Sequence, residues 1–237
     1  DFWRQVHQAD KHDAEARRAL LGLYETLEKW KEYAAVLQLE VAEIPEEDTA
    51  GRIGALRKLV AVYTEHLNMD AMVVQLYNQI LEIDPGDEGA IEALVDKYEK
   101  MRRWPDLVGL VQRQADHAVG AERTALNLRI ARLYLEKFRN QGEAIKAYEK
   151  VLDDEPENRE AIEALDGMYE KRRDWEKLVD VRSKLADLEE DPDARTRAYK
   201  ALADYATKKI RRPNICRELW EKVLEIQPGE DDALRAL

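Results

Sequence analysis

The chain has 237 residues, of which 45% are hydrophobic, enough to furnish a sizeable core. Fifty acidic against 38 basic side chains leave a formal net charge of −12, which disfavours nucleic acid and anionic lipid as partners because both need a positive footprint. The single cysteine, Cys216, excludes a disulfide framework, and no apolar run is long enough to span a bilayer, so we expect no membrane insertion. The compartment stays open, although we favour the cytoplasm.

The chain opens on what reads as a partial repeat, residues 1–10. Trp3 and Val6 align with Tyr77 and Ile80 of a later segment, so the chain begins within the last helix of a preceding unit. The opening residues also lack the basic-then-apolar layout of a signal peptide. We therefore expect a segment of a longer array, or open ends that meet other copies head to tail.

Three long repeats follow, over about 11–84, 85–155 and 156–227, and residues 228–237 start another. The phrase "AIEALVDKYEKMRRWPDL" at Ala90 returns as "AIEALDGMYEKRRDWEKL" at Ala161, an offset of 71 residues. Going backwards, Trp104 aligns with Trp30 at an offset of 74. Self-similarity at such a period is the signature of a repeat architecture.

Each long repeat divides into two halves, and each half reads as a helix pair. Apolar residues recur at spacings of three and four throughout, which is the period of a helix and not of a strand. Pro-containing breaks such as "PGD", "PEN" and "DPD" separate the helices, and acidic residues at these breaks are expected to cap helix starts. The pattern predicts twelve helices in six antiparallel pairs, plus partial helices at both ends. The first halves share a Leu, a Tyr and a Trp that we expect to pack between helices: Leu20, Tyr24, Trp30; Leu94, Tyr98, Trp104; Leu165, Tyr169, Trp175.

These halves resemble tetratricopeptide repeats, and "EAIKAYEKVLDDEPEN" carries the resemblance most clearly. It has an Ala, an aromatic residue four positions later, a small or aliphatic residue, and then Pro156. The resemblance implies an all-α, right-handed α-solenoid of antiparallel helix pairs that forms one domain over residues 1–237. The chain departs from the family where a small residue usually follows the first helix's Leu, since Leu21, Val95 and Asp166 stand there.

Residues with catalytic or ligand-binding chemistry form no recognisable constellation. None of His7, His12, His66 and His117 makes the i, i+4 pair of a helical metal site, and His7 with His12 could form only a weak, adventitious one. Cys216 aligns with core positions and has no neighbouring His, and no glycine-rich phosphate loop occurs. We therefore predict no catalytic residues, no metal, no cofactor and no enzyme activity.

What remains is the surface. In the family that the chain resembles, the first helix of each pair lines a concave groove that grips a peptide. Transfer of that register implies the groove residues Arg18, Glu25, Arg57, Glu92, Asp96, Glu99, Leu128, Arg132, Glu163, Glu170 and Tyr199. A basic residue also recurs at one register, at Lys58, Arg129 and Lys200, and it either contacts a ligand or belongs to a solvated helix face. The nearest approach to the Lys and Asn pair of chaperone-binding members is Arg123 with Asn127, which lacks the Lys, so we do not predict that activity.

The leading hypothesis is a non-catalytic scaffold or adaptor that binds a peptide or protein segment along this groove. The first alternative is structural self-assembly by head-to-tail stacking through uncapped ends. A helical repeat scaffold of the RNA-processing type is the second alternative, and the net charge of −12 counts against it.

Overall fold

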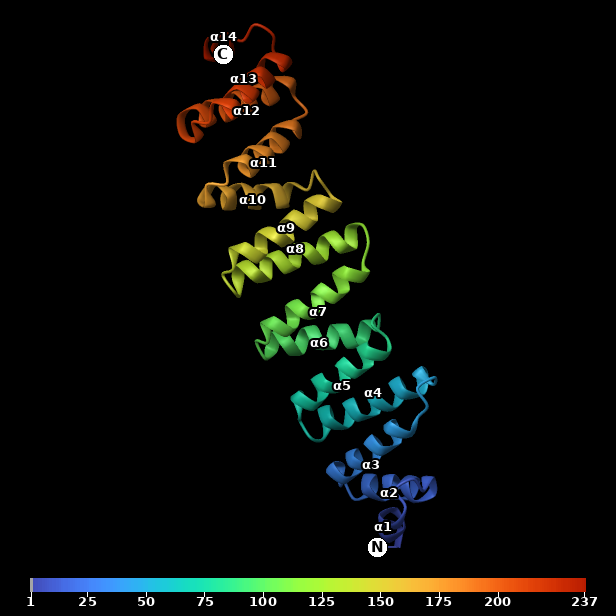
Figure 1. The fold of residues 1–237 in the computed structure, drawn as a ribbon. Coiled ribbons are helices and arrows are strands. Elements are labelled where there is room, and N and C mark those ends of the chain that lie inside the picture. The colour runs from blue at the N-terminus through green and yellow to red at the C-terminus, as the bar shows by residue number, and fades with distance from the viewer. Residues whose placement is uncertain (1) are drawn as a thin grey trace. The chain divides into compact units, whose positions relative to one another are not determined.

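The computed structural model describes residues 2–237, and every regular element in this range is a helix (Figure 1). The contacts divide the chain into two compact units, residues 1–110 and 111–237. The division falls inside helix α7 (Trp104–His117), which contributes its first half to unit 1 and its second half to unit 2.

Unit 1 is a zigzag of helices in which contacts join each one to the next as far as the sixth. Its elements are α1 (Phe2–Ala9), α2 (Ala14–Thr26), α3 (Trp30–Glu43), α4 (Thr49–Glu65), α5 (Asp70–Ile83), α6 (Glu88–Lys100) and the start of α7. Short loops reverse the chain between them, so α2 with α3 and α4 with α5 form antiparallel hairpins.

Unit 2 repeats this arrangement. Its elements are the rest of α7, α8 (Ala121–Glu136), α9 (Gln141–Asp154), α10 (Arg159–Arg172), α11 (Trp175–Asp187), α12 (Pro192–Tyr205), a π-helical turn η1 (Ala206–Ile210), α13 (Pro213–Ile226) and α14 (Asp231–Ala236). Hairpins form from α8 with α9, α10 with α11, and α12 with α13. The all-α fold of tandem helix pairs is thus confirmed, and the expected repeat borders lie in the loops α5–α6 and α9–α10.

Capping by acidic and amide side chains fixes where many of these helices begin. The Asp48 carboxylate accepts a hydrogen bond of 2.8 Å from the Gly51 N–H, and Asp87 accepts one of the same length from Ala90. Asn158 accepts one of 3.1 Å from Ala161 at the start of α10. These side chains satisfy N–H groups that the first turn of a helix leaves unpaired, as expected from the acidic breaks in the sequence.

Apolar residues at helical spacing build the core of each unit. Leu94 and Leu165 are fully buried, and the tyrosines that follow them, Tyr98 and Tyr169, are each 3% exposed. The three repeated tryptophans are less enclosed than the sequence suggests, since all three are only half-buried: Trp30, Trp104 and Trp175. Trp175 packs against the edge of a core cluster in unit 2. The three tryptophans lie at the first residue of a helix, where fewer neighbouring atoms are available than at its centre.

Each hairpin turn contains one residue in the left-handed conformation, and none of these residues is glycine. They are Glu28, Asn68 and Arg102 in unit 1, and Arg139, Arg173 and Arg211 in unit 2, with φ between 49° and 57°. At the α10–α11 turn the Arg173 N–H bonds the Glu170 carbonyl and the Asp174 N–H bonds the Tyr169 carbonyl, which is a Schellman motif. A residue with a Cβ atom is sterically strained in the left-handed conformation, and glycine is not, so these six turns cost the fold some free energy.

Candidate binding surfaces

The first helices of the hairpins are α2, α4, α6, α8, α10 and α12, and their expected groove positions are called here the first-helix surface. Eight of these residues are exposed: Arg18, Glu25, Arg57, Glu92, Asp96, Glu99, Arg132 and Glu163. Leu128 and Glu170 are half-buried. Tyr199 is 2% exposed and its hydroxyl donates to Asp187 at 2.8 Å, so it is a core residue and we leave it out of this surface.

Two cations of the first-helix surface, Arg57 and Arg132, form ion pairs within the chain. The Arg57 guanidinium lies 2.6 Å from the carboxylate of Asp87, the cap of α6. In unit 2, Arg132 of α8 meets Glu160 of α10, also at 2.6 Å. Each of these ion pairs ties one first helix to the start of the next one along the chain.

The repeated basic register behaves in the same way at its last member. The Lys200 ammonium lies 2.5 Å from Glu230, which precedes α14, and 2.6 Å from Asp232. Hydrogen bonds to Asp232 and Glu230 raise the pKa of Lys200 well above its ordinary value. At Lys200 the register therefore serves the fold; Lys58 is exposed and Arg129 is half-buried.

Acidic members of the first-helix surface also have partners on the chain. Asp96 pairs with Lys100 at 2.8 Å and Glu163 with Arg159 at 2.9 Å, both one helical turn apart. Glu170 accepts a hydrogen bond of 2.6 Å from the Tyr205 hydroxyl, and this bond, helped by the charge of Arg182, lowers the pKa of Glu170. The two exposed pairs, of Asp96 and of Glu163, contribute little to stability, so a ligand can displace them at little cost in free energy.

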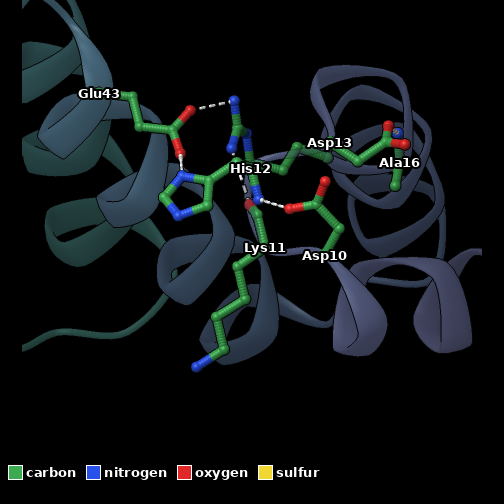
Figure 2. Close-up of polar contacts among 7 residues, drawn as sticks. Asp10, Lys11, His12, Asp13, Ala16 and Glu43 are labelled. Atoms are coloured by element: carbon green, nitrogen blue, oxygen red, sulfur yellow. Dashed lines mark hydrogen bonds and ion pairs between the residues drawn. The ribbon is translucent and has the colours of Figure 1, made fainter.

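The histidine considered as a metal ligand has a different role. Figure 2 shows the His12 ring turned toward Glu43, the last residue of α3. The Nδ1 of His12 lies 2.5 Å from Oε1 of this carboxylate. Arg17 of α2 pairs with the other oxygen of this carboxylate and donates to the Lys11 carbonyl at 2.8 Å. Desolvation opposes ionisation of Glu43, but the hydrogen bonds from His12 and Arg17 outweigh it and lower its pKa. The cluster joins the α1–α2 loop to the first hairpin.

A third register links the buried tyrosine of a first helix to the helix before it. The Tyr98 hydroxyl accepts a hydrogen bond of 2.9 Å from the Asn78 amide, and 71 residues later the Tyr169 hydroxyl donates to Glu149 at 2.8 Å. Glu149 also pairs with Lys177. The contact is the same in both repeats, but the partner of the tyrosine changes from a neutral amide to a carboxylate. The sequence analysis did not predict this contact, although the repeat alignment pairs Asn78 with Glu149.

Three surface grooves lie at equivalent places in the repeat. Each lies between the second helices of two successive hairpins and over the first helix that connects them in the chain. Groove 1 lies among α3, α4 and α5, with a volume of about 550 Å³. Groove 2 lies among α7, α8 and α9, with about 360 Å³. Groove 3 lies among α11, α12 and α13, with about 420 Å³. On α4 the lining residues Arg52, Leu56 and Leu59 occupy a different side of the helix from the exposed Arg57.

Grooves 1 and 2 are built from the same positions. Every residue that lines groove 2 has its repeat counterpart lining groove 1: Gln112 and Gln38, Ala115 and Val41, Asp116 and Ala42, Arg123 and Arg52, Asn127 and Leu56, Lys150 and Gln79, Asp153 and Glu82, Asp154 and Ile83. Repetition therefore produces these surfaces, and the sequence analysis, which placed binding only on the first helices, did not find them.

Within residues 2–237 no group of three or more His, Cys, Asp or Glu side chains is arranged to hold a metal ion. In the same range no helix combines the length and the apolar character that crossing a bilayer requires. Cys216 is half-buried against a core cluster of unit 2.

No protein-family model and no curated protein sequence matches the chain. Among solved structures, the C-terminal part of a TPR repeat-containing protein from Cytophaga hutchinsonii is 12% identical, with all of this chain and 92% of that chain covered and a TM-score of 0.39. The chain is a tandem helical repeat similar to tetratricopeptide-repeat proteins. A tetratricopeptide repeat protein from Parabacteroides merdae is 11% identical (99% and 88% covered, TM-score 0.33), and the MamA protein is 14% identical (82% and 92% covered, TM-score 0.34). These likenesses carry no argument about what the chain binds.

Proposed function

We propose that the chain is a non-catalytic scaffold that binds a peptide or protein segment on its first-helix surface. The observation that supports this is the exposure of eight of the ten residues of that surface, in both units, while the opposite sides of the same helices are buried. On α6, for example, Glu92, Asp96 and Glu99 are exposed, whereas Leu94 and Tyr98 are in the core. A rigid helix with an uncovered charged face is suited to steering and orienting a partner.

Crosslinking the purified chain to proteins of its own cell, with mass spectrometry of the linked residues, tests this. An identified partner is then bound to the variant Glu92→Lys/Asp96→Lys, and we expect its Kd to rise about tenfold. The control Glu122→Lys changes an exposed charge at the start of α8, outside the surface, and leaves Kd unchanged. A partner linked only to other surfaces, or small-molecule turnover without a partner, would refute the proposal.

Head-to-tail association is the second candidate. The exposed apolar side chains of Phe2, Leu234 and Leu237 are surface that such stacking would bury. Light scattering over a range of protein concentrations tests it: a mass that rises with concentration supports the candidate, and a constant monomer mass removes it. RNA binding has no comparable observation in its favour.

A further inference from the structure

Groove 1 combines an apolar floor with a polar rim, which is the usual make-up of a ligand-binding site. Leu56, Leu59 and Leu76 belong to the buried core and reach the groove from below. Gln75 and Gln79 lie along α5 at its side. The volume of about 550 Å³ accommodates a few amino-acid residues and not a whole helix.

Arg52 is the unusual member of this groove. Its Nε is buried and has no hydrogen-bond partner. A buried N–H of a charged group that is left unpaired costs free energy, because it has lost water and gained nothing in exchange. A guanidinium also presents its N–H groups as a planar fork that matches a carboxylate.

The equivalent arginine in groove 2 shows what is missing. Arg123 occupies the position of Arg52 one repeat later, and its Nε donates to the Asp154 carboxylate at 2.7 Å. The residue that corresponds to Asp154 in groove 1 is Ile83, which cannot accept a hydrogen bond. One groove thus supplies a carboxylate to its arginine from its own second helix, and the other does not.

We propose that groove 1 binds a short, extended protein segment that presents a carboxylate to Arg52 and an adjacent apolar side chain to the leucine floor. The proposal rests on the proposed function, since it takes the chain to bind protein segments, and it adds a second surface and the chemistry of the partner. The ligand carboxylate accepts from Arg52 the kind of hydrogen bond that Asp154 accepts from Arg123 in groove 2. The rim amides of Gln75 and Gln79 are placed to bond the backbone of the segment.

A peptide carboxylate fits this groove better than a phosphate. Glu46 and Glu82 line the same groove, and their charges repel a dianion more strongly than a single carboxylate. The apolar floor gains from a hydrophobic side chain, which inorganic phosphate and nucleic-acid backbones do not offer. Groove 2 demonstrates that one carboxylate satisfies an arginine in this setting.

A phage-displayed library of random heptapeptides, panned on the whole chain, tests the proposal. The selected peptides should share Asp or Glu beside Leu, Ile, Val, Met or Phe. Synthetic copies should bind Arg52→Gln about tenfold more weakly in fluorescence anisotropy. Ile83→Asp should weaken binding similarly, because it copies groove 2 and gives Arg52 a carboxylate of its own. The matched variant Arg123→Gln should bind like the wild type.

Circular dichroism establishes that each variant is folded. Arg52→Lys keeps the charge but loses the planar fork of the guanidinium, so it should weaken peptide binding less than Arg52→Gln does. Selection of no peptide, of peptides without a carboxylate, or of peptides that bind Arg52→Gln as well as the wild type would overturn the inference. So would displacement of the peptide by millimolar inorganic phosphate. None of these outcomes tests binding at the first-helix surface, so that proposal would stand. The variant Glu92→Lys/Asp96→Lys separates the two proposals: it should weaken binding of the crosslinked partner and leave binding of the selected peptides to groove 1 unchanged.

Discussion

Unit 1 and unit 2 place different chemistry on the same positions of the repeat. Where unit 1 has Leu56, Asn78 and Ile83, unit 2 has Asn127, Glu149 and Asp154. The backbone hardly responds: both sets lie on helices of nearly the same bounds, over a core of the same kind. The comparison teaches that a repeat scaffold fixes where side chains stand and leaves their polarity free to vary.

The largest effect that we expect from this comparison concerns the residues at the floor of the grooves. Leu56 is 2% exposed, and Leu56→Asn removes apolar contacts and buries an amide without a partner in unit 1. We expect the free energy of unfolding to fall by about 3 kcal/mol. Urea denaturation measures the loss, and hydrogen exchange should place it in α4 and α5. A loss below about 1 kcal/mol would mean that the two floors are interchangeable.

The tyrosine register gives the next effect in size. Tyr169→Phe removes a hydrogen bond to a carboxylate and should cost about 1.5 kcal/mol, discounted because Glu149 is partly exposed. Tyr98→Phe loses only a bond from a neutral amide and should cost about 1 kcal/mol. Both values come from urea denaturation at neutral pH, and equal costs would show that the charge of Glu149 adds nothing.

The same pair differs in its pH dependence. Desolvation acts to raise the pKa of Glu149, but hydrogen bonds from Lys177 and Tyr169 outweigh it and hold this pKa below its ordinary value of 4.5. A lowered folded-state pKa stabilises the fold above 4.5, and this stabilisation is lost as the pH falls through the folded value. The loss of unfolding free energy caused by Tyr169→Phe should therefore become smaller as the pH falls below the folded-state pKa of Glu149. The loss caused by Tyr98→Phe should stay constant over the same range, and urea denaturation at several pH values measures both.

The reciprocal change in groove 2 should stabilise the protein. Asn127 is 3% exposed and its Oδ1 has no hydrogen-bond partner. Asn127→Leu copies Leu56, removes the unpaired oxygen and should raise the free energy of unfolding by about 1 kcal/mol. A higher midpoint in urea confirms this. Destabilisation would show that Asn127 contributes to unit 2 in a way that the comparison omits.

The smallest effect concerns the hairpin turns. Arg173 and its counterpart Arg102 both have left-handed backbone, with φ of 57° and 54°. Replacing either by Gly removes the steric cost of a side chain there and should stabilise the fold by about 0.5–1 kcal/mol. Thermal unfolding should register a similar gain for both. Unequal gains would indicate that the two turns are not equivalent.

The helix pairs could be predicted from sequence because their signals are local and repeated. Leu165 and Tyr169 are buried as their spacing indicates, and the breaks carry the expected caps. The exposure of the expected groove residues was predicted less well. Tyr199 shares a register with Arg57, yet its ring is enclosed and its hydroxyl reaches Asp187 of α11, which depends on the packing of a neighbouring hairpin.

The sequence contained information about groove 1 that the sequence analysis did not use. The alignment pairs Arg52 with Arg123, and Ile83 with Asp154, so it shows that one arginine has lost a carboxylate at the equivalent position. Only the structure shows that the ends of α5 and α9 come within reach of these arginines. A repeat alignment identifies a changed pair, but the helix packing decides whether the pair is in contact.

The ion pairs of Arg57 with Asp87 and of Arg132 with Glu160 bear on how the chain unfolds. Each one couples a hairpin to its neighbour, and such coupling decides whether repeats melt together or one by one. The Arg132 pair is exposed on both sides, so salt screens it, whereas the carboxylate of Asp87 is buried and its pair is screened less. We therefore expect ionic strength to act on the coupling between α8 and α10: at high salt one of these two hairpins should open more readily while its neighbour stays folded.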